Sequence, residues 1–464
     1  MRTLAGALAL LAACGDDATK NQELPAWDPT LPEAAPAFGV RRGLSPARGI
    51  VHLHSPYSHD ACDGDPRPGG APNEPCLADL RAALCTTRID FANLTDHDDT
   101  MADEDFSKLF SMRGTDQAVM RGGMQVASRI LCDNGHQILV TVGGENDLMP
   151  IMLDRHVTAA TVAERHGIMN GNDAATAAAF RDAGGLVWVA HTESKTLDTL
   201  RAVAPDGIEV YNLHANIDPD IRKDYLGLPS GSAIASAVEF ADTQPGHPEP
   251  DLAMLAFFSA NQPSIDKWTA LLGEGKHVAV TAGSDAHQNA LPVMLADGER
   301  GDSYRRVLRW FGNIALVQDP RDIDQIKAAM KAGRMFAVFE LLGTPEGFDV
   351  SATSASGQTY EIGDVIPRAG GGAVLTVEVP KVRSLDPSLP APTITGIVYW
   401  IDATGSHELA RGEQTFMANL GARGAYRVEI RMTPSHLAPY LRDLGSALAD
   451  KELPWIYTSP FYVE

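Results

Sequence analysis

The sequence predicts an α/β protein in which a TIM-like barrel of parallel strands and helices precedes an antiparallel β-sandwich. Between residue 49 and about residue 320, seven short apolar runs alternate with helix-forming stretches, which is typical of parallel strands joined by crossover helices. At least six of these seven runs end in His, Asp, Glu or Asn. After about residue 345, apolar and polar residues alternate between Gly/Pro-rich turns, as in antiparallel sheets.

The predicted barrel covers residues 47–344, and seven strands are enough to bend a sheet into a barrel-like shape. We expect strands at 49–54, 89–97, 137–145, 185–191, 207–212, 277–287 and 313–317. Helices are expected between them at 76–88, 172–185, 196–205, 264–276 and 322–334. Barrel active sites form at the carboxyl ends of the strands. The polar residues at those ends are therefore expected to share one pocket.

The predicted sandwich covers residues 345–464. Its alternating segments are 372–380, 394–402, 425–432 and 455–464. This part of the sequence has no comparable set of histidines and aspartates, so we place the chemistry in the barrel. Capping the barrel, binding a sugar or a surface, and simple stabilisation all remain open as its task.

The first residues have the layout of a secretory signal. Arg2 precedes an apolar stretch that ends in "LAAC", which resembles a bacterial lipobox with Cys14 as the lipidated residue. A polar linker at 15–46 follows the signal at 1–14. We expect an exported lipoprotein, periplasmic or on the outer surface, with membrane attachment only through Cys14. The alternative is a short apolar tail that happens to contain a cysteine.

Composition limits the partners. The 464 residues carry a formal net charge of −22, and no cluster of Lys and Arg stands out. A nucleic-acid groove held by phosphate contacts is therefore not expected. An anionic substrate would have to be attracted by a local feature such as bound cations. We expect a small-molecule, anionic substrate, and the sequence predicts no oligomeric state.

Export would permit disulfides. Four cysteines remain besides Cys14, and their spacing does not match a zinc knuckle: Cys62, Cys76, Cys85 and Cys132. Disulfides that staple loops and free buried thiols are equally good interpretations.

Histidines and acids at the strand ends indicate a metal centre. His52 and His54 share one face of a strand because side chains alternate along it. Alone, this pair is a weak signal, but Asp285 and His287 repeat the spacing on another strand. Three further strand ends supply His97, Glu145 and His191. Imidazoles mixed with carboxylates suit zinc, manganese or iron, and so many ligands imply two or three divalent ions.

In order along the chain, these motifs resemble those of the PHP (polymerase and histidinol phosphatase) family over roughly residues 47–340. "HLHSPYSHD", "TDHD", "GGE", "AHTES" and "GSDAH" carry the resemblance, with Thr192 where the family often has proline. The family fold is a distorted seven-stranded barrel with two or three metal ions. The resemblance implies ligand roles for Asp60 and His156 as well, with His59 as a rival to Asp60. The signal and tail further resemble an exported branch that includes carbamate-ester hydrolases.

Other residues near these motifs are candidates for catalysis or substrate contact. Leaving-group protonation could come from Asp98, Asp99, His59, His214 or a metal-held water, and we take Asp98 and His214 as catalytic candidates. Substrate-binding candidates are Tyr57, His59, Lys195 and Glu209, with Arg155 as a weaker one. Structural or solvent-exposed roles are equally open for several of them.

The site and the family resemblance together predict an exported metal-dependent hydrolase. We expect a phosphoesterase that cleaves small phosphate mono- or diesters with a metal-activated water in one displacement step. An alternative is hydrolysis of another polarised bond, such as an aryl carbamate, carboxyl ester, phosphotriester or glycoside, because fold and metals do not fix the substrate. A different class of function is a non-catalytic binding lipoprotein with structural metals.

Overall fold

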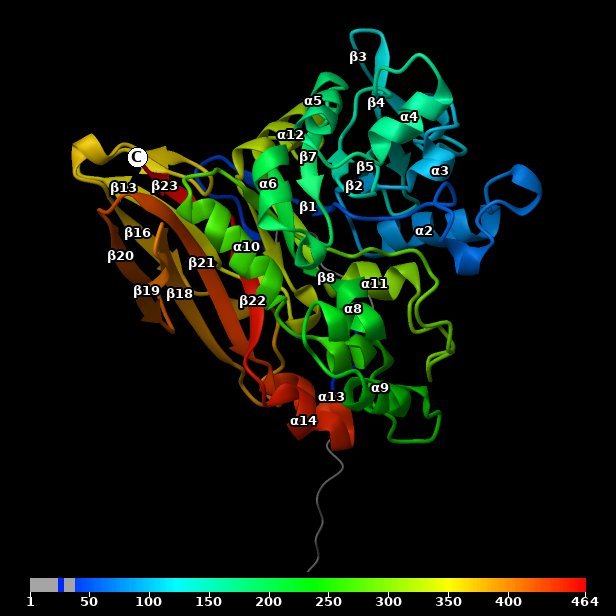
Figure 1. Cartoon of the computed structure of the whole chain (residues 1–464). Coiled ribbons are helices and arrows are strands. Elements are labelled where there is room, and N and C mark those ends of the chain that lie inside the picture. The colour runs from blue at the N-terminus through cyan, green and yellow to red at the C-terminus, as the bar shows by residue number, and fades with distance from the viewer. Residues whose placement is uncertain (1–23, 29–37) are drawn as a thin grey trace, which may run out of the picture.

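The computed structural model describes residues 24–28 and 38–464. Cys14, the signal and much of the predicted linker lie outside the described residues. Within the described part of the chain, no helix is both long and apolar enough to cross a membrane. Figure 1 shows a mixed α/β molecule, with the N-terminal strands and most helices on one side and the C-terminal strands on the other.

Two parallel groups of strands form the site-bearing half. One group contains β1 (Ser45–Ile50), β2 (Phe91–Leu94) and β5 (Gln137–Val142). The other contains β7 (Leu186–Val189), β8 (Gly207–Asn212) and β9 (Ala279–Gly283). The short β6 (Met149–Ile151) pairs antiparallel with β7. Six of the seven predicted runs therefore supply parallel strands.

The two groups are separate sheets whose margins meet at single bridges. Leu53 pairs with Ala286, which brings the end of β1 beside the end of β9, and Val142 pairs with Leu153 between β5 and β6. Closure into one seven-stranded barrel remains our interpretation of this arrangement. The bridge at Leu53 matters for the site because it places the segments after β1 and β9 side by side.

The seventh predicted strand runs against the others. β10 (Gly312–Val317) is antiparallel to β1, with Asn313 opposite Gly49 and Val317 opposite Ser45. It thus begins near the carboxyl end of β1, because residues 284–311, including α11 (Tyr304–Trp310), stay at that end of the sheet. The expectation that this run is parallel was wrong.

All five predicted helices are confirmed, and each follows a side-chain cap. The helices are α2 (Glu74–Thr86), α5 (Ala174–Asp182), α6 (Leu197–Val203), α10 (Gln262–Gly273) and α12 (Ile323–Ala332). Their N-caps are Asn73, Asp173, Thr196, Asn261 and Asp322, whose side chains accept hydrogen bonds from backbone N–H groups of the first turn. Such caps satisfy donors that the helix itself leaves unpaired.

Several elements were not predicted. They include a hairpin of β3 (Gln117–Arg121) and β4 (Met124–Leu131), where β4 pairs antiparallel with β5. The segment between β8 and α10 forms α7 (Leu213–Ile217), α8 (Pro219–Asp224) and α9 (Gly231–Val238). The remaining short helices are α3 (Asp98–Met101), α4 (Val162–Met169), α13 (Ala438–Leu441) and α14 (Gly445–Ala449). Each of them spans eight residues or fewer.

Most C-terminal strands form two sheets, and β12 (Pro345–Glu346) pairs with β17 (Lys381–Val382) in a separate two-stranded ribbon. One sheet contains β13 (Asp349–Ser354), β14 (Thr359–Tyr360), β16 (Ala373–Glu378) and β20 (Phe416–Leu420). The other strands are β18 (Thr393–Asp402), β19 (Gly405–Gly412), β21 (Gly424–Thr433), β22 (Leu453–Thr458), β23 (Phe461–Val463) and β15 (Val365–Ile366). They continue the β1 sheet, because β22 pairs with β11 (Met335–Val338), which pairs with β10. Strand pairing thus crosses the expected boundary at residue 345, and the separate sandwich remains an interpretation.

The described residues contain two disulfides, which decides between the stapled loops and the free thiols. Cys62 is bonded to Cys76 and Cys85 to Cys132. The first ties the loop after β1 to α2, and the second ties α2 to the end of β4. The loop after β1 and the end of β4 are thereby fixed to the same helix.

Candidate metal centre

His52 and His54 leave β1 with their rings aimed at one point. Both side chains are fully buried, and their Nε2 atoms are 3.1 Å apart. Nitrogens at this separation can share one proton in a hydrogen bond, or both lone pairs can face one cation. Carboxylates supply the charge around them. The Nε2 atom of His54 lies 3.1 Å from Asp285 Oδ1 and 3.4 Å from Glu145 Oε2.

Glu145 and Asp285 are the central acids. Glu145 follows β5 and Asp285 follows β9, and both are almost completely buried. His52 Nε2 is 3.3 Å from Glu145 Oε2 and 3.2 Å from Asp285 Oδ1. Burial alone would raise the pKa of Asp285, but the surrounding imidazoles hold it well below its usual range. Both acids are therefore anionic and contact several imidazoles at once.

A second group lies beside this core. His97, at the start of α3, places Nε2 3.5 Å from Asp60 Oδ2 and 3.6 Å from Glu145 Oε2. His287 places Nε2 3.8 Å from the same Asp60 oxygen and 3.6 Å from Asp285 Oδ1. This His287 nitrogen is buried without a hydrogen-bond partner. Burial lowers the pKa of His287 to about 4, so its ring is neutral near pH 7.

A third group contains two more imidazoles. His191 follows β7, and its Nε2 is 2.9 Å from Asp285 Oδ2 and 3.6 Å from Glu145 Oε1. His214, in α7, places Nδ1 3.2 Å from Asp285 Oδ2. Both His191 and Asp285 have left-handed backbone conformations, with φ of 45° and 51°. Such conformations are costly for residues other than glycine and often occur at functional sites.

Partners on the far side of each ring fix its tautomer. His52 Nδ1 donates to Glu209 Oε1 at 2.9 Å, and His97 Nδ1 donates to the carbonyl oxygen of Glu145 at 2.7 Å. Ser58 gives its own hydroxyl proton to Asp60 Oδ1 at 2.7 Å, so its oxygen accepts from His54 Nδ1 at 3.0 Å. In each ring a proton is therefore assigned to Nδ1, and Nε2 faces the cluster, where its lone pair would be available to a bound metal ion.

Packing supports these partners. A Cβ atom at Gly283 would collide with the Glu209 carboxylate, so only glycine on β9 leaves room for that acid. Asn212 Nδ2 lies 3.1 Å from Glu209 Oε2 and 3.4 Å from Asp285 Oδ2. The Glu209 carboxylate is thus held from two sides while it accepts from His52.

The donor set fits divalent metal ions. Three overlapping groups have ligand atoms close enough to share an ion: His52, His54, Glu145 and Asp285; His54, Asp60 and His97; and His191, His214 and Asp285. Each imidazole offers a single free nitrogen, whereas carboxylates can bridge two ions. Glu145 and Asp285 are therefore the residues that could connect neighbouring ions. Imidazole with carboxylate suits zinc, manganese or iron.

Eight of the nine predicted ligands come together in this cluster: His52, His54, Asp60, His97, Glu145, His191, Asp285 and His287. His156 does not join them. Its Nε2 donates to the carbonyl oxygen of Glu104 at 2.8 Å, and its ring packs on Phe106. His214, predicted as a catalytic residue and not as a ligand, also contacts the cluster.

The other predicted residues lie at varying distances from this cluster. Asp98 points to α4, where it accepts from His166 Nδ1 at 2.8 Å. Tyr57 is buried with its ring under Arg67, whose Cζ lies 5.3 Å from the ring centroid. Lys195 pairs with Asp147 at 3.3 Å. His59 lies at the exposed rim, bonded to Asp99, with its ring 4.9 Å from that of His97.

Sequence reasoning missed three supporting residues. Glu193 accepts from His191 Nδ1 at 2.9 Å, Ser58 from His54, and Asp96 accepts from Ser55 N at 2.6 Å. Burial raises the pKa of Asp96 to about 6. The sequence did contain a signal for Glu193. In "AHTES", just after a strand end, this acid lies two residues beyond the ligand His191.

Comparisons with known proteins give distant similarities. No family model matches this sequence, and no curated protein matches it. Among solved structures, a two-domain protein from Bacteroides vulgatus that contains a predicted PHP-like metal-dependent phosphoesterase is similar at 12% identity and a TM-score of 0.38, over 94% of this chain and 100% of that chain. The lesion-specific endonuclease PfuEndoQ from Pyrococcus furiosus is 14% identical, with a TM-score of 0.33 over 68% of this chain and 64% of that one. PsfC from Pseudomonas syringae is 11% identical, with a TM-score of 0.28 over 58% of this chain and 82% of that one. At this distance, the functional assignment rests on the side chains of this chain.

Proposed function

We propose that the protein is a PHP-type metal-dependent phosphoesterase that acts on small phosphate mono- or diesters. The observation that carries the proposal is the convergence of Asp and Glu carboxylates with imidazoles from β1, β2, β5, β7, β8 and β9 at one buried cluster. Divalent ions bound there would polarise phosphoryl oxygens and lower the pKa of a water molecule. Such a set of ligands, with fixed tautomers, is suited to holding more than one ion.

Charge supports three ions rather than two. Besides Asp60, Glu145 and Asp285, the carboxylates of Glu193 and Glu209 bond directly to ligand imidazoles. Five carboxylates with neutral imidazoles would leave two divalent ions at a formal charge of about −1, and three ions at about +1. Only a site with three ions would have the net positive charge that attracts a phosphate dianion.

The residues of the chain have separable tasks in this proposal. Glu209, Glu193 and Ser58 hold three imidazoles with their lone pairs directed inward, which keeps the ligands ready without reorganisation. His214 touches Asp285 and also borders a large cavity. It is the group best placed to give a proton to a leaving alcohol, whereas Asp98 is already paired with His166.

Export and lipid attachment through Cys14 are part of the proposal. Two disulfides in the described chain support an oxidising compartment. Labelling with radioactive palmitate in a bacterial host tests it. The full chain is expected to take up label, and a Cys14→Ser variant is expected to take up none.

The function is tested by elemental analysis and hydrolysis assays on the same purified sample. We expect at least two ions per chain and phosphate release from p-nitrophenyl phosphate or bis(p-nitrophenyl) phosphate that chelator removes and metal restores. The same sample is assayed with carboxyl esters, an aryl carbamate and a glucuronide. Activity on those substrates alone would show that the protein hydrolyses one of these other polarised bonds and not phosphate esters. Bound metal without any hydrolysis would support a binding protein.

A further inference from the structure

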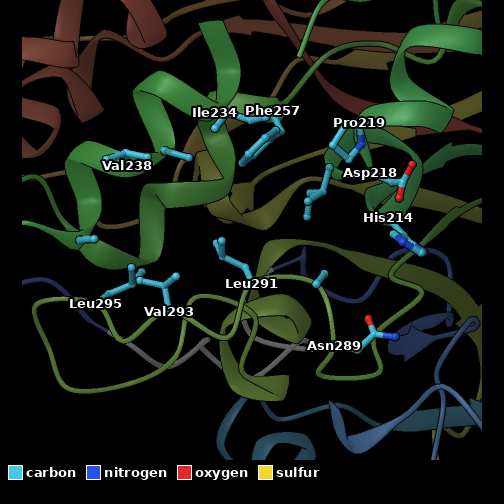
Figure 2. A pocket seen from close by; sticks show the side chains of 14 residues that line it. His214, Asp218, Pro219, Ile234, Val238, Phe257, Asn289, Leu291, Val293 and Leu295 are labelled. Carbon is cyan, nitrogen blue, oxygen red and sulfur yellow. The ribbon is translucent and has the colours of Figure 1, made fainter. Parts of the chain in front are cut away.

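A large apolar cavity opens beside the metal centre. Its volume is about 620 Å³, within the range of small-molecule sites. Figure 2 shows two facing walls, one from α9 and the segment after it and the other from the loop after β9. The labelled apolar side chains of these walls are Ile234, Val238, Phe257, Leu291, Val293 and Leu295.

The cavity adjoins the candidate metal centre. His214 lines it and lies 3.2 Å from Asp285, and Asn289 lines it and donates to the main-chain oxygen of Asp60 at 2.8 Å. A smaller void of about 20 Å³ shares His214 with the cavity and is also bordered by Asp285 and His287. In Figure 2, His214 and Asn289 lie at one end and Val238 and Leu295 at the other. One ligand could therefore contact the centre and extend along the cavity.

The lining selects an uncharged, apolar group. In the described part of the chain, no Lys or Arg lines the cavity. The single lining carboxylate, Asp218, is engaged by the backbone N–H groups of Asp220 and Ile221 at 2.9 Å, where it caps α8. Apolar side chains on the walls face water, with Val238 63% exposed and Val293 47% exposed. Surfaces of this kind on soluble proteins commonly mark binding sites.

Resting on the proposed function, we infer that the substrate is an amphipathic phosphate monoester whose apolar alcohol group occupies this cavity. A methylene fills roughly the volume of a water molecule, about 30 Å³, so a chain of eight carbons fits with room to spare. Water attacks phosphorus, the bond from phosphorus to the alcohol oxygen breaks, and a proton passes to that oxygen. The products are inorganic phosphate and the apolar alcohol.

Binding of n-alkylphosphonates tests the inference without requiring turnover, because their carbon–phosphorus bond is not hydrolysed. Ethyl-, butyl-, hexyl- and octylphosphonate are titrated calorimetrically into the metal-loaded full chain, below their micelle concentrations. We expect Kd to fall about two- to fourfold for each added methylene, as burial of methylene groups requires. Equal Kd values across the series would overturn the inference.

Two variants and a matched control locate the effect. Val238→Asp changes an exposed wall residue, and Leu291→Asp changes the opposite wall, so a folding failure of the second leaves the first informative. Met417→Asp on β20 is the control, since Met417 is 66% exposed and lies far along the chain from the cavity walls. The octyl-to-ethyl affinity ratio is expected to fall at least tenfold in the wall variants and to persist in the control. A ratio that is the same in Val238→Asp and Met417→Asp would overturn the inference.

The test separates this inference from the proposed function. If no ester released phosphate, the proposed phosphoesterase function would be rejected. The phosphonate series would still test whether the cavity binds apolar chains. If phosphate is released but Kd is the same for all phosphonates, the phosphoesterase function would stand and the inference of an apolar substrate group would be rejected.

Discussion

His191 and Glu193 are joined by a hydrogen bond of 2.9 Å from Nδ1 to Oε1, although both belong to one short turn after β7. The other oxygen of Glu193 accepts from Asn261 Nδ2 at 2.8 Å and lies 3.3 Å from Ser264 Oγ. α10 thereby anchors an acid that orients a ring of the metal cluster. The other ring nitrogen of His191, Nε2, donates to Asp285 Oδ2 at 2.9 Å.

Replacing Glu193 by Gln should weaken metal binding without unfolding the protein. The amide keeps the size of the side chain but removes the charge that favours the Nδ1-protonated ring, and losses of such partners typically cost about 10- to 100-fold in affinity or activity. Competition with a chromophoric chelator measures the affinity. Glu346→Gln, at an exposed position on β12 (Pro345–Glu346), is the control. If both variants bind metal with equal affinity, Glu193 does not support the metal site.

A pair of histidine variants distinguishes residues inside the cluster from those outside it. His97→Ala should lose at least one ion per chain by elemental analysis and about two orders of magnitude in hydrolysis, because His97 contacts both Asp60 and Glu145. His156→Ala should keep every ion, since its ring bonds to a main-chain carbonyl. Loss of metal from His156→Ala would show that this ring moves into the cluster when ions bind.

The two histidines also show how far the sequence could predict the site. His97 was predictable because it ends an apolar strand, and parallel strands bring their carboxyl ends together. His156 was assigned as a ligand because it is the histidine that follows Glu145 in the family motif. Its place in the sequence does not determine where its side chain points, because the segment between the two residues is short and irregular. His214 lies two residues after β8. Nothing in the sequence distinguishes a histidine that contacts a metal ion at this position from one that donates a proton to the substrate.

The same limit applies to the fold. Local patterns predicted the helices, whose periodicity and caps are contained in adjacent residues. The direction of β10 and the pairing of β11 with β22 depend on contacts between distant segments, which alternation of apolar residues does not encode. The domain boundary at residue 345 was drawn where the composition changes, but hydrogen bonds between strands continue across that point.

A buried ion pair should make a large contribution to stability near this boundary. Arg48 on β1 and Glu340 after β11 are both fully buried, with donor–acceptor distances of 2.6 and 2.7 Å. Glu340→Gln would leave the Arg48 charge without its carboxylate, and breaking such a pair costs about 3–5 kcal/mol. Urea unfolding measures the free energy. Glu408→Gln, which breaks the exposed pair with Arg411, should cost less than about 1 kcal/mol. Similar costs for both variants would contradict the prediction.

His436 should make stability depend on pH in a defined window. Its ring is buried, and its Nε2 donates to the carbonyl oxygen of Leu342 at 3.0 Å. Burial lowers its pKa to about 4 from an ordinary value of 6.5. The unfolded chain therefore binds the proton more readily, so the contribution is complete above about pH 6.5 and is lost as pH falls towards 4. A shift of this size corresponds to roughly 3 kcal/mol.

The measurement is the difference in unfolding free energy between the native protein and His436→Gln, taken from pH 4 to 7.5 with chelator present. Glutamine can still donate to Leu342 but does not titrate in this range, so titration of other groups cancels in the difference. We expect the advantage of the native residue to shrink as pH falls from 6.5 to 4 and to be constant above 6.5. A difference that is flat across the whole range would mean that the His436 ring is accessible to protons in the folded protein, because only a buried ring resists protonation down to pH 4.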